Sequence, residues 1–198
     1  GADAPEKVVP HELRLKAARK PYNIARYFYL TVEKENEEAF LKLYKERLTV
    51  RQHHVETGKF LWFALFKARI NEFGSNYVVS VGQDSVQLEG GRRSWETPHL
   101  PAFFSADQWT ETTSEMDKLR TFNGSLMVAL RDYTVGDMDA SKWPEDPRKI
   151  VLNIGYMKPA EGKERVYRDA ERDVFQKVWQ NRYDNDPSFL WWGFYSLR

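Results

Sequence analysis

The stretch Phe189-Leu-Trp-Trp-Gly-Phe-Tyr-Ser-Leu-Arg198 decides the fold, because an earlier stretch, Phe60-Leu-Trp-Phe-Ala-Leu-Phe-Lys-Ala-Arg69, repeats its pattern. Both are runs of aromatic and aliphatic residues, which predict β-strands. Each of the two runs is preceded by a charged segment whose apolar residues recur at helical spacing. Each of these charged segments is in turn preceded by a shorter aromatic run. Tyr29 precedes Phe40 by the same spacing as Tyr156 precedes Tyr167. The sequence therefore predicts a strand–helix–strand unit that is used twice.

The strand predicted at 60–67 has apolar residues on both of its faces. Trp62 and Phe66 point to one side, and Phe63 and Leu65 point to the other, because side chains alternate along a strand. A sheet with one wet face would instead alternate apolar and polar residues. We therefore expect helices to cover one face and a second sheet or another subunit to cover the other.

Two helices are expected between the strands of the first unit. Asn36 is the expected N-cap of the first helix, and Gly58 marks its end. The buried stripe of this helix is predicted from its apolar residues, Ala39, Phe40, Leu43, Tyr44 and Leu48. Ser105, three residues before Gln108, is a capping-box signature that begins the second helix. Its stripe is Trp109, Thr113, Met116 and Leu119, and Asn123-Gly124 is expected to end it.

The strands of this unit are predicted at 26–32, 60–67, 77–81 and 125–130, joined by a turn at 71–76 and a long loop at 83–104. The order β-α-β-β-α-β across 26–135 is that of the ferredoxin-like fold, so the predicted class is α+β. Residues 1–25 are expected to form an N-terminal arm, and residues 136–149 a linker.

The remaining residues, 150–198, are expected to form a second, partial repeat. It consists of a strand at 150–158, a helix at 162–183 and a strand at 189–197. The predicted buried stripe of its helix is Val166, Tyr167, Ala170, Val174, Phe175 and Val178. Either the repeat is naturally half-length or residues beyond 198 complete it.

Composition excludes several kinds of function. Lys and Arg are interleaved with Asp and Glu, and the net charge of +1 leaves no basic face for nucleic acid. The chain contains no Cys, so disulfides, thiolate metal sites and a Cys nucleophile are excluded. No apolar run is long enough to span a bilayer, and no phosphate-binding loop or nucleophile elbow is present. A start without Met, at Gly1-Ala-Asp, favours a mature exported protein, periplasmic or extracellular, over a shortened cytoplasmic one.

A family resemblance rests on the second unit. The run Tyr156-Met-Lys-Pro-Ala-Glu-Gly-Lys-Glu164, together with Tyr167, Glu171, Trp179 and Trp191-Trp-Gly-Phe-Tyr195, resembles the dimeric α/β-barrel superfamily, in particular its NIPSNAP-like and uncharacterised exported bacterial members. The resemblance implies ferredoxin-like units whose sheets pack face to face as a barrel, between tandem repeats or between the subunits of a homodimer. Members include cofactor-independent monooxygenases, haem-handling enzymes and proteins without established activity, so the fold alone does not choose a function.

His53 and His54, at the end of the first helix, are the candidate catalytic residues. A His that faces a cleft can act as a base near neutral pH. Adjacent helical residues point in different directions, so the pair makes a poor chelate and no metal site is predicted. The resemblance implies a proximal His for haem-dependent members, but the second helix has Gln180-Asn181 at the matching place. No cofactor is therefore expected, with haem as the alternative.

The candidate ligand-binding residues are aromatic side chains of the strands, Tyr29, Trp62, Tyr156 and Trp191, and residues of the long loop, Arg92, Trp95 and His99. Core packing and a solvated loop are the alternatives for these two groups. For Asp132 and Tyr133 we expect only a role in a turn or at a rim. The predicted function is binding of a small apolar or aromatic molecule between sheets. An enzyme that uses His53 or His54, and a purely structural module, are the alternatives.

Overall fold

The computed structural model describes residues 24–72, 74–83, 100–133, 144–146 and 149–197. Residues 1–23 of the predicted arm and the loop residues Arg92, Trp95 and His99 lie outside these ranges, whereas Ile24 and Ala25, also assigned to the arm, are buried strand residues. The chain divides into two compact units, residues 1–128 with 197–198 and residues 129–196. Among the described residues, no helix has the length and apolar character needed to cross a membrane.

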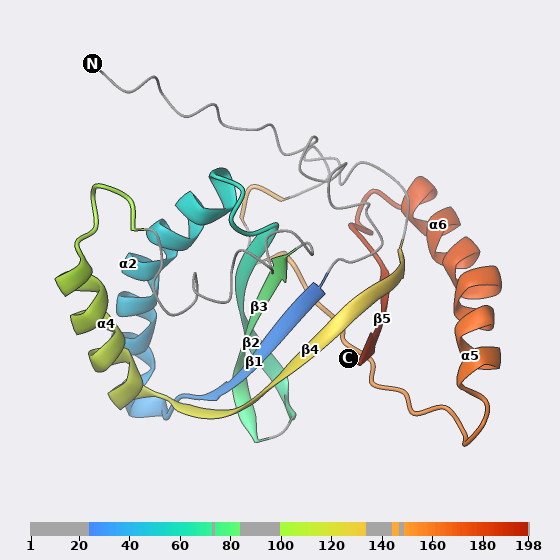
Figure 1. Cartoon of the computed structure of the whole chain (residues 1–198), viewed down its shortest axis with the longest axis horizontal. Helices are drawn as coiled ribbons and strands as arrows, with labels where there is room; N and C mark the ends of the chain where they lie inside the picture. Colours follow the sequence, from blue (N-terminus) through green and yellow to red (C-terminus); the bar gives the residue numbers. More distant parts are fainter. Residues whose placement is uncertain (1–23, 73, 84–99, 134–143, 147–148, 198) are drawn as a thin grey trace, which may run out of the picture. The chain divides into compact units, whose positions relative to one another are not determined.

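The described strands form one sheet, as Figure 1 shows. The strands are β1 (Ile24–Thr31), β2 (Trp62–Glu72), β3 (Ser75–Gln83), β4 (Thr121–Tyr133) and β5 (Gly193–Leu197). Their order across the sheet is β2-β3-β1-β4-β5, and both β1 and β2 pair antiparallel with β3. Together with the helices they confirm the predicted α+β class and the order β-α-β-β-α-β along the first unit.

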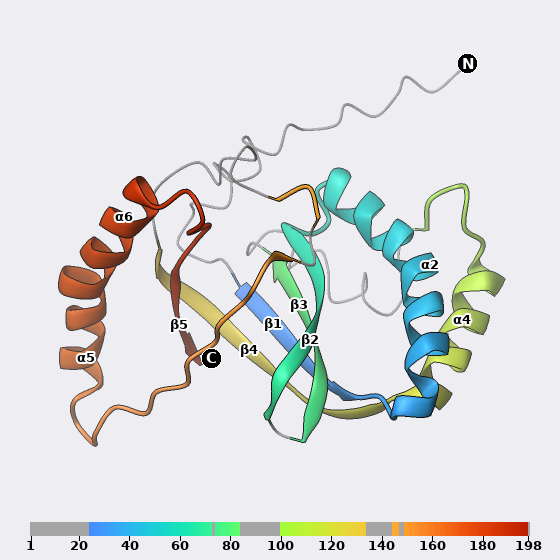
Figure 2. The ribbon, with the colours of Figure 1, turned by 180° about the vertical axis from the view of Figure 1, so that it is seen from behind.

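Helices α2 (Glu37–Glu56) and α4 (Ala106–Leu119) lie side by side in Figures 1 and 2. The capping box of α4 is confirmed: the Ser105 hydroxyl accepts a hydrogen bond from the Gln108 amide at 3.1 Å, and the Gln108 side chain accepts one from the Ser105 amide at 2.8 Å. Gly58, with a φ of 74°, follows the end of α2 as predicted. Asn36 occupies the N-cap position, but its side chain makes no capping bond. A 3₁₀ turn, Lys34–Asn36, leads directly into the helix and leaves Asn36 in a helical conformation.

The helices and the sheet enclose the main apolar core, in which Leu30, Phe40, Phe60, Val81 and Met116 are each at most 2% exposed. The predicted stripe of α2 is partly wrong. Ala39 is exposed and Leu48 is 38% exposed, and Val50, Arg51 and His54 are buried with Phe40 and Tyr44. The face of α2 that packs inward therefore includes polar side chains, and a prediction based only on the spacing of apolar residues does not identify them.

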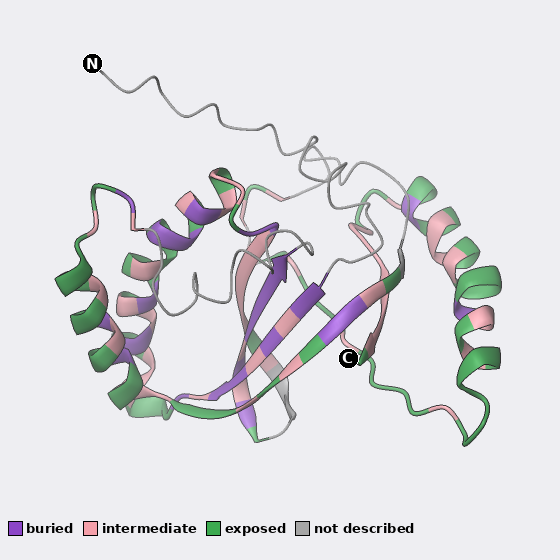
Figure 3. Ribbon diagram, viewed as in Figure 1, coloured by how far each residue is buried: buried purple, intermediate pink, exposed green. Residues whose placement is uncertain are grey.

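The opposite face of the sheet also carries buried residues. Strand alternation places Tyr27, Tyr29 and Ser80 on the side away from α2 and α4, and these side chains are 8%, 3% and 4% exposed. Figure 3 shows buried and half-buried residues alternating along β1. Burial on both faces agrees with the expectation from the two-faced apolar strands.

Two asparagines hold the strands of the first unit in register. The Asn76 amide donates to the Val32 carbonyl at 2.7 Å, and its oxygen accepts from the Val32 amide at 2.9 Å. Asn123 donates to the hydroxyls of Thr31 and Ser75, both at 2.7 Å. The prediction that Asn123-Gly124 ends the second helix is wrong, because α4 ends at Leu119 and both residues lie inside β4. Asn123 is instead a strand residue whose side chain forms hydrogen bonds to residues of other strands.

The second unit contains one long helical run. It comprises α5 (Glu164–Ala170), a π-helical segment (Glu171–Phe175) and α6 (Gln176–Asn185), and it confirms the helix predicted at 162–183. Beside it, Trp179 stacks on Phe189 with ring centroids 5.5 Å apart. At the sheet, Arg131 of β4 donates to the Ser196 hydroxyl of β5 at 2.6 Å.

Two predictions for this unit are wrong. Residues 150–158 form no strand, and Val151 and Met157 there are 67% and 64% exposed. A run of strand-forming residues becomes a strand only when another strand pairs with it, and none of the described strands does. The predicted helical stripe is also misplaced: Val166, Val174, Phe175 and Val178 are 45–63% exposed, whereas Glu171 and Tyr183 are buried.

Candidate functional site

A cavity of about 510 Å³ lies in the first unit between the sheet and the two helices. Ligand cavities in proteins typically measure roughly 300–1,000 Å³. The strands contribute Phe28, Leu30, Phe63, Val79 and Phe122 to its lining, and the helices with the residue after α4 contribute Tyr44, Arg47, Leu48, Arg51, Met116, Asp117 and Arg120. The cavity therefore joins an apolar wall from the sheet to a polar wall from the helices.

The apolar wall is largely aromatic. Phe28 of β1 and Phe122 of β4 lie with ring centroids 6.5 Å apart. Phe63 of β2 stacks on Tyr44 of α2 at 6.2 Å and 21°. Offset and tilted rings of this kind present flat faces and edges to a bound apolar group. The wall is suited to the body of a small aromatic or aliphatic molecule.

The polar wall begins with two guanidinium groups one helical turn apart on α2. Arg47 lies over the Trp109 ring of α4 with its guanidinium carbon 3.9 Å from the centroid, and Arg51 lies 4.8 Å from the same centroid. Arg51 also lies 5.3 Å from the centroid of Phe63. Stacking on an aromatic face leaves the N–H donors in the guanidinium plane directed sideways. The aromatic rings therefore position both cations.

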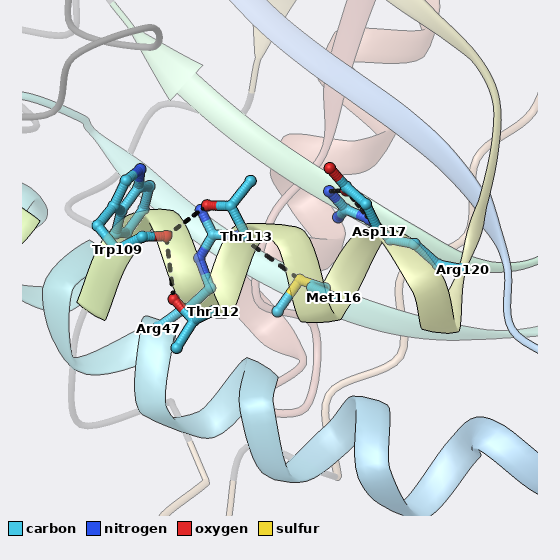
Figure 4. Close-up of polar contacts among 7 residues, drawn as sticks. All are labelled: Arg47, Trp109, Thr112, Thr113, Met116, Asp117 and Arg120. Carbon is cyan, nitrogen blue, oxygen red and sulfur yellow. Dashed lines mark hydrogen bonds and ion pairs between the residues drawn. The ribbon is translucent and has the colours of Figure 1, made fainter. Parts of the chain in front are cut away.

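Figure 4 shows how α4 contributes to this wall. Arg47 donates to the sulfur of Met116 at 3.7 Å, a weak acceptor. Arg120 is bound by the Asp117 carboxylate, with Nη2 and Nε at 2.9 and 3.3 Å from the same oxygen. In the described part of the chain Arg47 forms no ion pair, and the described charged residues of the lining are Arg47, Arg51, Arg120 and Asp117.

Burial changes the ionisation of these groups. Loss of hydration, together with a smaller effect of the neighbouring charge of Arg47, lowers the pKa of Arg51 to about 10. Loss of hydration also lowers the pKa of Arg47 to about 10, with Arg120 adding repulsion and Asp117 opposing it. Burial raises the pKa of the Tyr44 hydroxyl above its usual value, although the three arginines oppose the shift. At neutral pH the cavity thus holds cationic arginines and a neutral phenol.

The Tyr44 hydroxyl is itself unusual. The side chain is 7% exposed, and its oxygen is buried with no hydrogen-bond partner among the described residues. A buried hydroxyl without a partner costs about 1–3 kcal/mol. An acceptor supplied by a bound molecule would recover that cost.

The two candidate histidines lie outside the cavity lining. The His53 ring meets the edge of Phe103 at 6.1 Å, and the buried His54 ring packs on Phe60 at 5.6 Å. Their own centroids are 6.4 Å apart and tilted by 53°, which agrees with the expectation that adjacent histidines point in different directions. In the described ranges, no cluster of three or more His, Asp and Glu side chains is arranged to hold a metal ion.

None of the four aromatic candidates is among the described residues that line this cavity. Tyr29 and Trp62 lie on the sheet face away from the helices; they pair with Val78 and Gly82 respectively, about 13 Å apart along β3. In the second unit, Tyr156 is 46% exposed outside any strand, and Trp191 precedes β5.

Sequence reasoning missed the arginines of the cavity. Arg47 and Arg51 are four residues apart and lie on the same face of the helix as the buried Phe40 and Tyr44. A pair of basic residues on a helix face that packs inward was the signal in the sequence that could have identified them. The sequence matches no protein-family model and no curated protein, so the site must be interpreted from its own geometry.

Proposed function

We propose that the protein binds a small molecule with an aromatic or aliphatic body in the cavity between the sheet and helices α2 and α4. The single observation that carries the proposal is the cavity of about 510 Å³ with its continuous apolar wall from β1, β2, β3 and β4. The sequence favoured a ligand between sheets; the cavity supports a place between sheet and helices instead.

A blocking variant tests this proposal. Leu48 lines the cavity at its exposed margin, where Leu48→Trp would fill the space without rebuilding the core. Ala39→Trp is the matched control, because Ala39 is exposed on the same helix and does not line the cavity. Isothermal titration of naphthalene derivatives should show saturable binding to the wild type and the control, and at least tenfold weaker binding to Leu48→Trp. Equal affinity in all three proteins would contradict the proposal.

We also propose that the first unit is ferredoxin-like and belongs to the dimeric α/β-barrel type. The strand order β2-β3-β1-β4 with two helices on one face supports this, because a βαββαβ chain of that fold has the same arrangement. Tyr27 and Tyr29 on the other face are buried within a single chain, which supports a second layer supplied by the chain itself. Light scattering should therefore give the mass of a monomer, and the mass of a dimer would show that a second subunit contributes to the barrel.

The enzyme alternative depends on His53 and His54. Both rings pack against phenylalanines and neither lines the cavity, so the site geometry favours binding over catalysis by these residues. Addition of haem tests the haem version of this alternative. A Soret shift that His54→Ala abolishes would favour it over the proposal.

A further inference from the structure

We infer that the ligand of this cavity carries a hydrogen-bond acceptor, such as a carbonyl oxygen, which binds the hydroxyl of Tyr44 while the apolar body of the ligand lies on the phenylalanines of the sheet. This inference rests on the proposed function and specifies the chemical class of the ligand. The apolar wall and the volume of the cavity would accept a pure hydrocarbon equally well. The requirement for an acceptor comes from one polar group in the wall.

The first step concerns where the hydroxyl of Tyr44 lies. Tyr44 lines the cavity from α2, and its ring stacks on Phe63 of β2 with the centroids 6.2 Å apart. The charges that act on its hydroxyl are those of Arg47, Arg51 and Arg120, and all three of these arginines also line the cavity. The hydroxyl end of the side chain therefore lies among the cationic groups of the lining.

The second step concerns the missing partner of this hydroxyl. The side chain of Tyr44 is 7% exposed, and its oxygen has no hydrogen-bond partner among the described residues. The buried hydroxyl of Tyr77, in contrast, donates to the Glu37 carboxylate at 2.5 Å. Buried polar groups in native proteins are nearly always bonded, so an exception needs an explanation. A ligand bound in the cavity would supply the partner.

The third step concerns the chemistry that matches a phenol. Burial raises the pKa of the Tyr44 hydroxyl above its usual value, so the group keeps its proton at neutral pH and donates it. The guanidinium groups of Arg47, Arg51 and Arg120 have only donors and cannot accept this hydrogen. Asp117, the carboxylate of the lining, binds Arg120. The acceptor for the phenol therefore has to come from the ligand, which an alkyl chain or an ammonium group does not offer.

Two ligands of the same shape test the inference on the full chain. 2-Acetylnaphthalene and 2-isopropenylnaphthalene share one ring system and one branched substituent, and they differ only in a carbonyl oxygen against a CH₂ group. The hydrocarbon is the more apolar of the two, so it would bind more tightly in the absence of a hydrogen bond. We expect the wild type to bind the ketone at least as tightly as the hydrocarbon, as measured by quenching of tryptophan fluorescence.

One substitution assigns the preference to the phenol. Tyr44→Phe removes only the hydroxyl, and it should weaken binding of the ketone about fivefold while it changes binding of the hydrocarbon less than twofold. A fivefold change is about 1 kcal/mol, which is the usual net contribution of one hydrogen bond. Tyr77→Phe is the matched control, because Tyr77 is buried in the same core and does not line the cavity. The control should leave both affinities unchanged.

Thermal melts without ligand test the premise that the Tyr44 hydroxyl lacks a partner. Tyr77→Phe loses a hydrogen bond to Glu37, so it should lower the melting temperature by roughly 2–4 °C. Tyr44→Phe loses no such bond and should not lower it. A lower melting temperature of Tyr44→Phe, or its failure to fold, would show that the hydroxyl already has a partner in the free protein, and the inference would be wrong.

The carbonyl stretching frequency of the bound ketone identifies the donor. A hydrogen bond from the phenol should place this frequency lower in the wild type and in Tyr77→Phe than in Tyr44→Phe. An equal frequency in all three proteins would mean that another group, such as an arginine, binds the carbonyl, and it would overturn the inference.

The binding data separate this inference from the proposed function. If Tyr44→Phe weakens the ketone and the hydrocarbon equally, or weakens neither, the phenol does not select an acceptor and the inference is wrong, while binding in the cavity stands. A wild-type protein that prefers the hydrocarbon would contradict the inference without any variant. If neither ligand binds the wild type, the proposed function fails and the inference fails with it.

Discussion

The indole of Trp62 occupies the space beside the α-carbon of Gly82, its partner across the β2–β3 ladder. A Cβ atom at position 82 would lie 2.2 Å from the Trp62 ring. The same indole donates to the Ser80 hydroxyl at 3.0 Å, so the ring is fixed at both its face and its edge. Position 82 therefore requires glycine, because any other residue would place its Cβ atom against the Trp62 ring. The indole in turn covers this part of the sheet, where glycine has no side chain of its own.

We predict that Gly82→Ala destabilises the protein by about 1–3 kcal/mol, because the indole must move and lose its bond to Ser80. Gly155→Ala is the control: nothing lies within 4 Å of its Cβ position, and we expect a change below about 0.5 kcal/mol. Urea unfolding followed by circular dichroism measures both. Equal stability of the two variants would show that the indole is not confined by position 82.

A second prediction concerns Asn76, whose side chain pairs with both backbone polar groups of Val32. Asn76→Asp keeps the acceptor but removes the donor, and it places a carboxylate beside the Val32 carbonyl. We expect a loss of about 1–3 kcal/mol. Asn185→Asp, at an exposed position whose bonds stay within α6, should cost much less. The order of the two losses in chemical denaturation checks the explanation, and a reversed order would contradict it.

A third prediction concerns the stability cost of the cavity cations. The pKa of Arg47 is lowered to about 10 from an ordinary value of 12.5, so its charged form disfavours folding at every pH below about 10. Arg47→Met keeps the length and apolar contacts of the side chain and removes the charge. Because the lost stacking on Trp109 opposes this gain, we expect the free energy of unfolding to stay within about 1 kcal/mol of the wild type.

Phe40→Ala provides the contrast for that experiment, because Phe40 is fully buried in the same helix. We expect it to cost about 3–5 kcal/mol. If Arg47→Met cost as much as Phe40→Ala, Arg47 would be a structural residue, and the prediction would be wrong.

A fourth prediction concerns alkaline pH in the second unit. Tyr167 donates to the Glu171 carboxylate, and burial together with that bond raises the pKa of Tyr167 to about 12 from 10.0. A raised pKa in the folded state means that the contribution to stability is complete below about pH 10 and is lost as pH rises through about 12. Glu171→Gln should move the pKa of Tyr167 back towards 10. Ultraviolet titration of phenolate absorbance measures it, and Tyr167→Phe identifies the transition by removing it.

Much of the first unit could be predicted from sequence. Its strands and helices have strong local signals, such as the capping box at Ser105 and the two-faced apolar run at 60–67, and both are confirmed. The strand predicted at 150–158 is wrong, because Val151 and Tyr156 have strand propensity but none of the described strands pairs with them. Pairing is a property of the whole fold and is invisible in a short stretch.

The candidate site was harder to predict for a related reason. Arg47 and Arg51 were hidden because an inward helical face is recognised by its apolar residues, and these two are charged. Both guanidinium groups lie over the ring of Trp109, which comes from a helix far along the chain. The aromatic residues Tyr29 and Trp62 were more conspicuous in sequence, but they lie on the other face of the sheet.

The π-helical segment Glu171–Phe175 has a consequence for chains of slightly different length. A π turn contains about one residue more than an α turn, so removing one residue from this segment would restore an unbroken α-helix. Every later residue of the helix would then keep nearly the same orientation, because the wider π turn takes up the additional residue within itself. Trp179 would still face Phe189, and Tyr183 would keep its buried position. A relative one residue shorter within this segment would therefore keep the same aromatic pattern downstream, which is a feature to look for when homologous sequences are aligned.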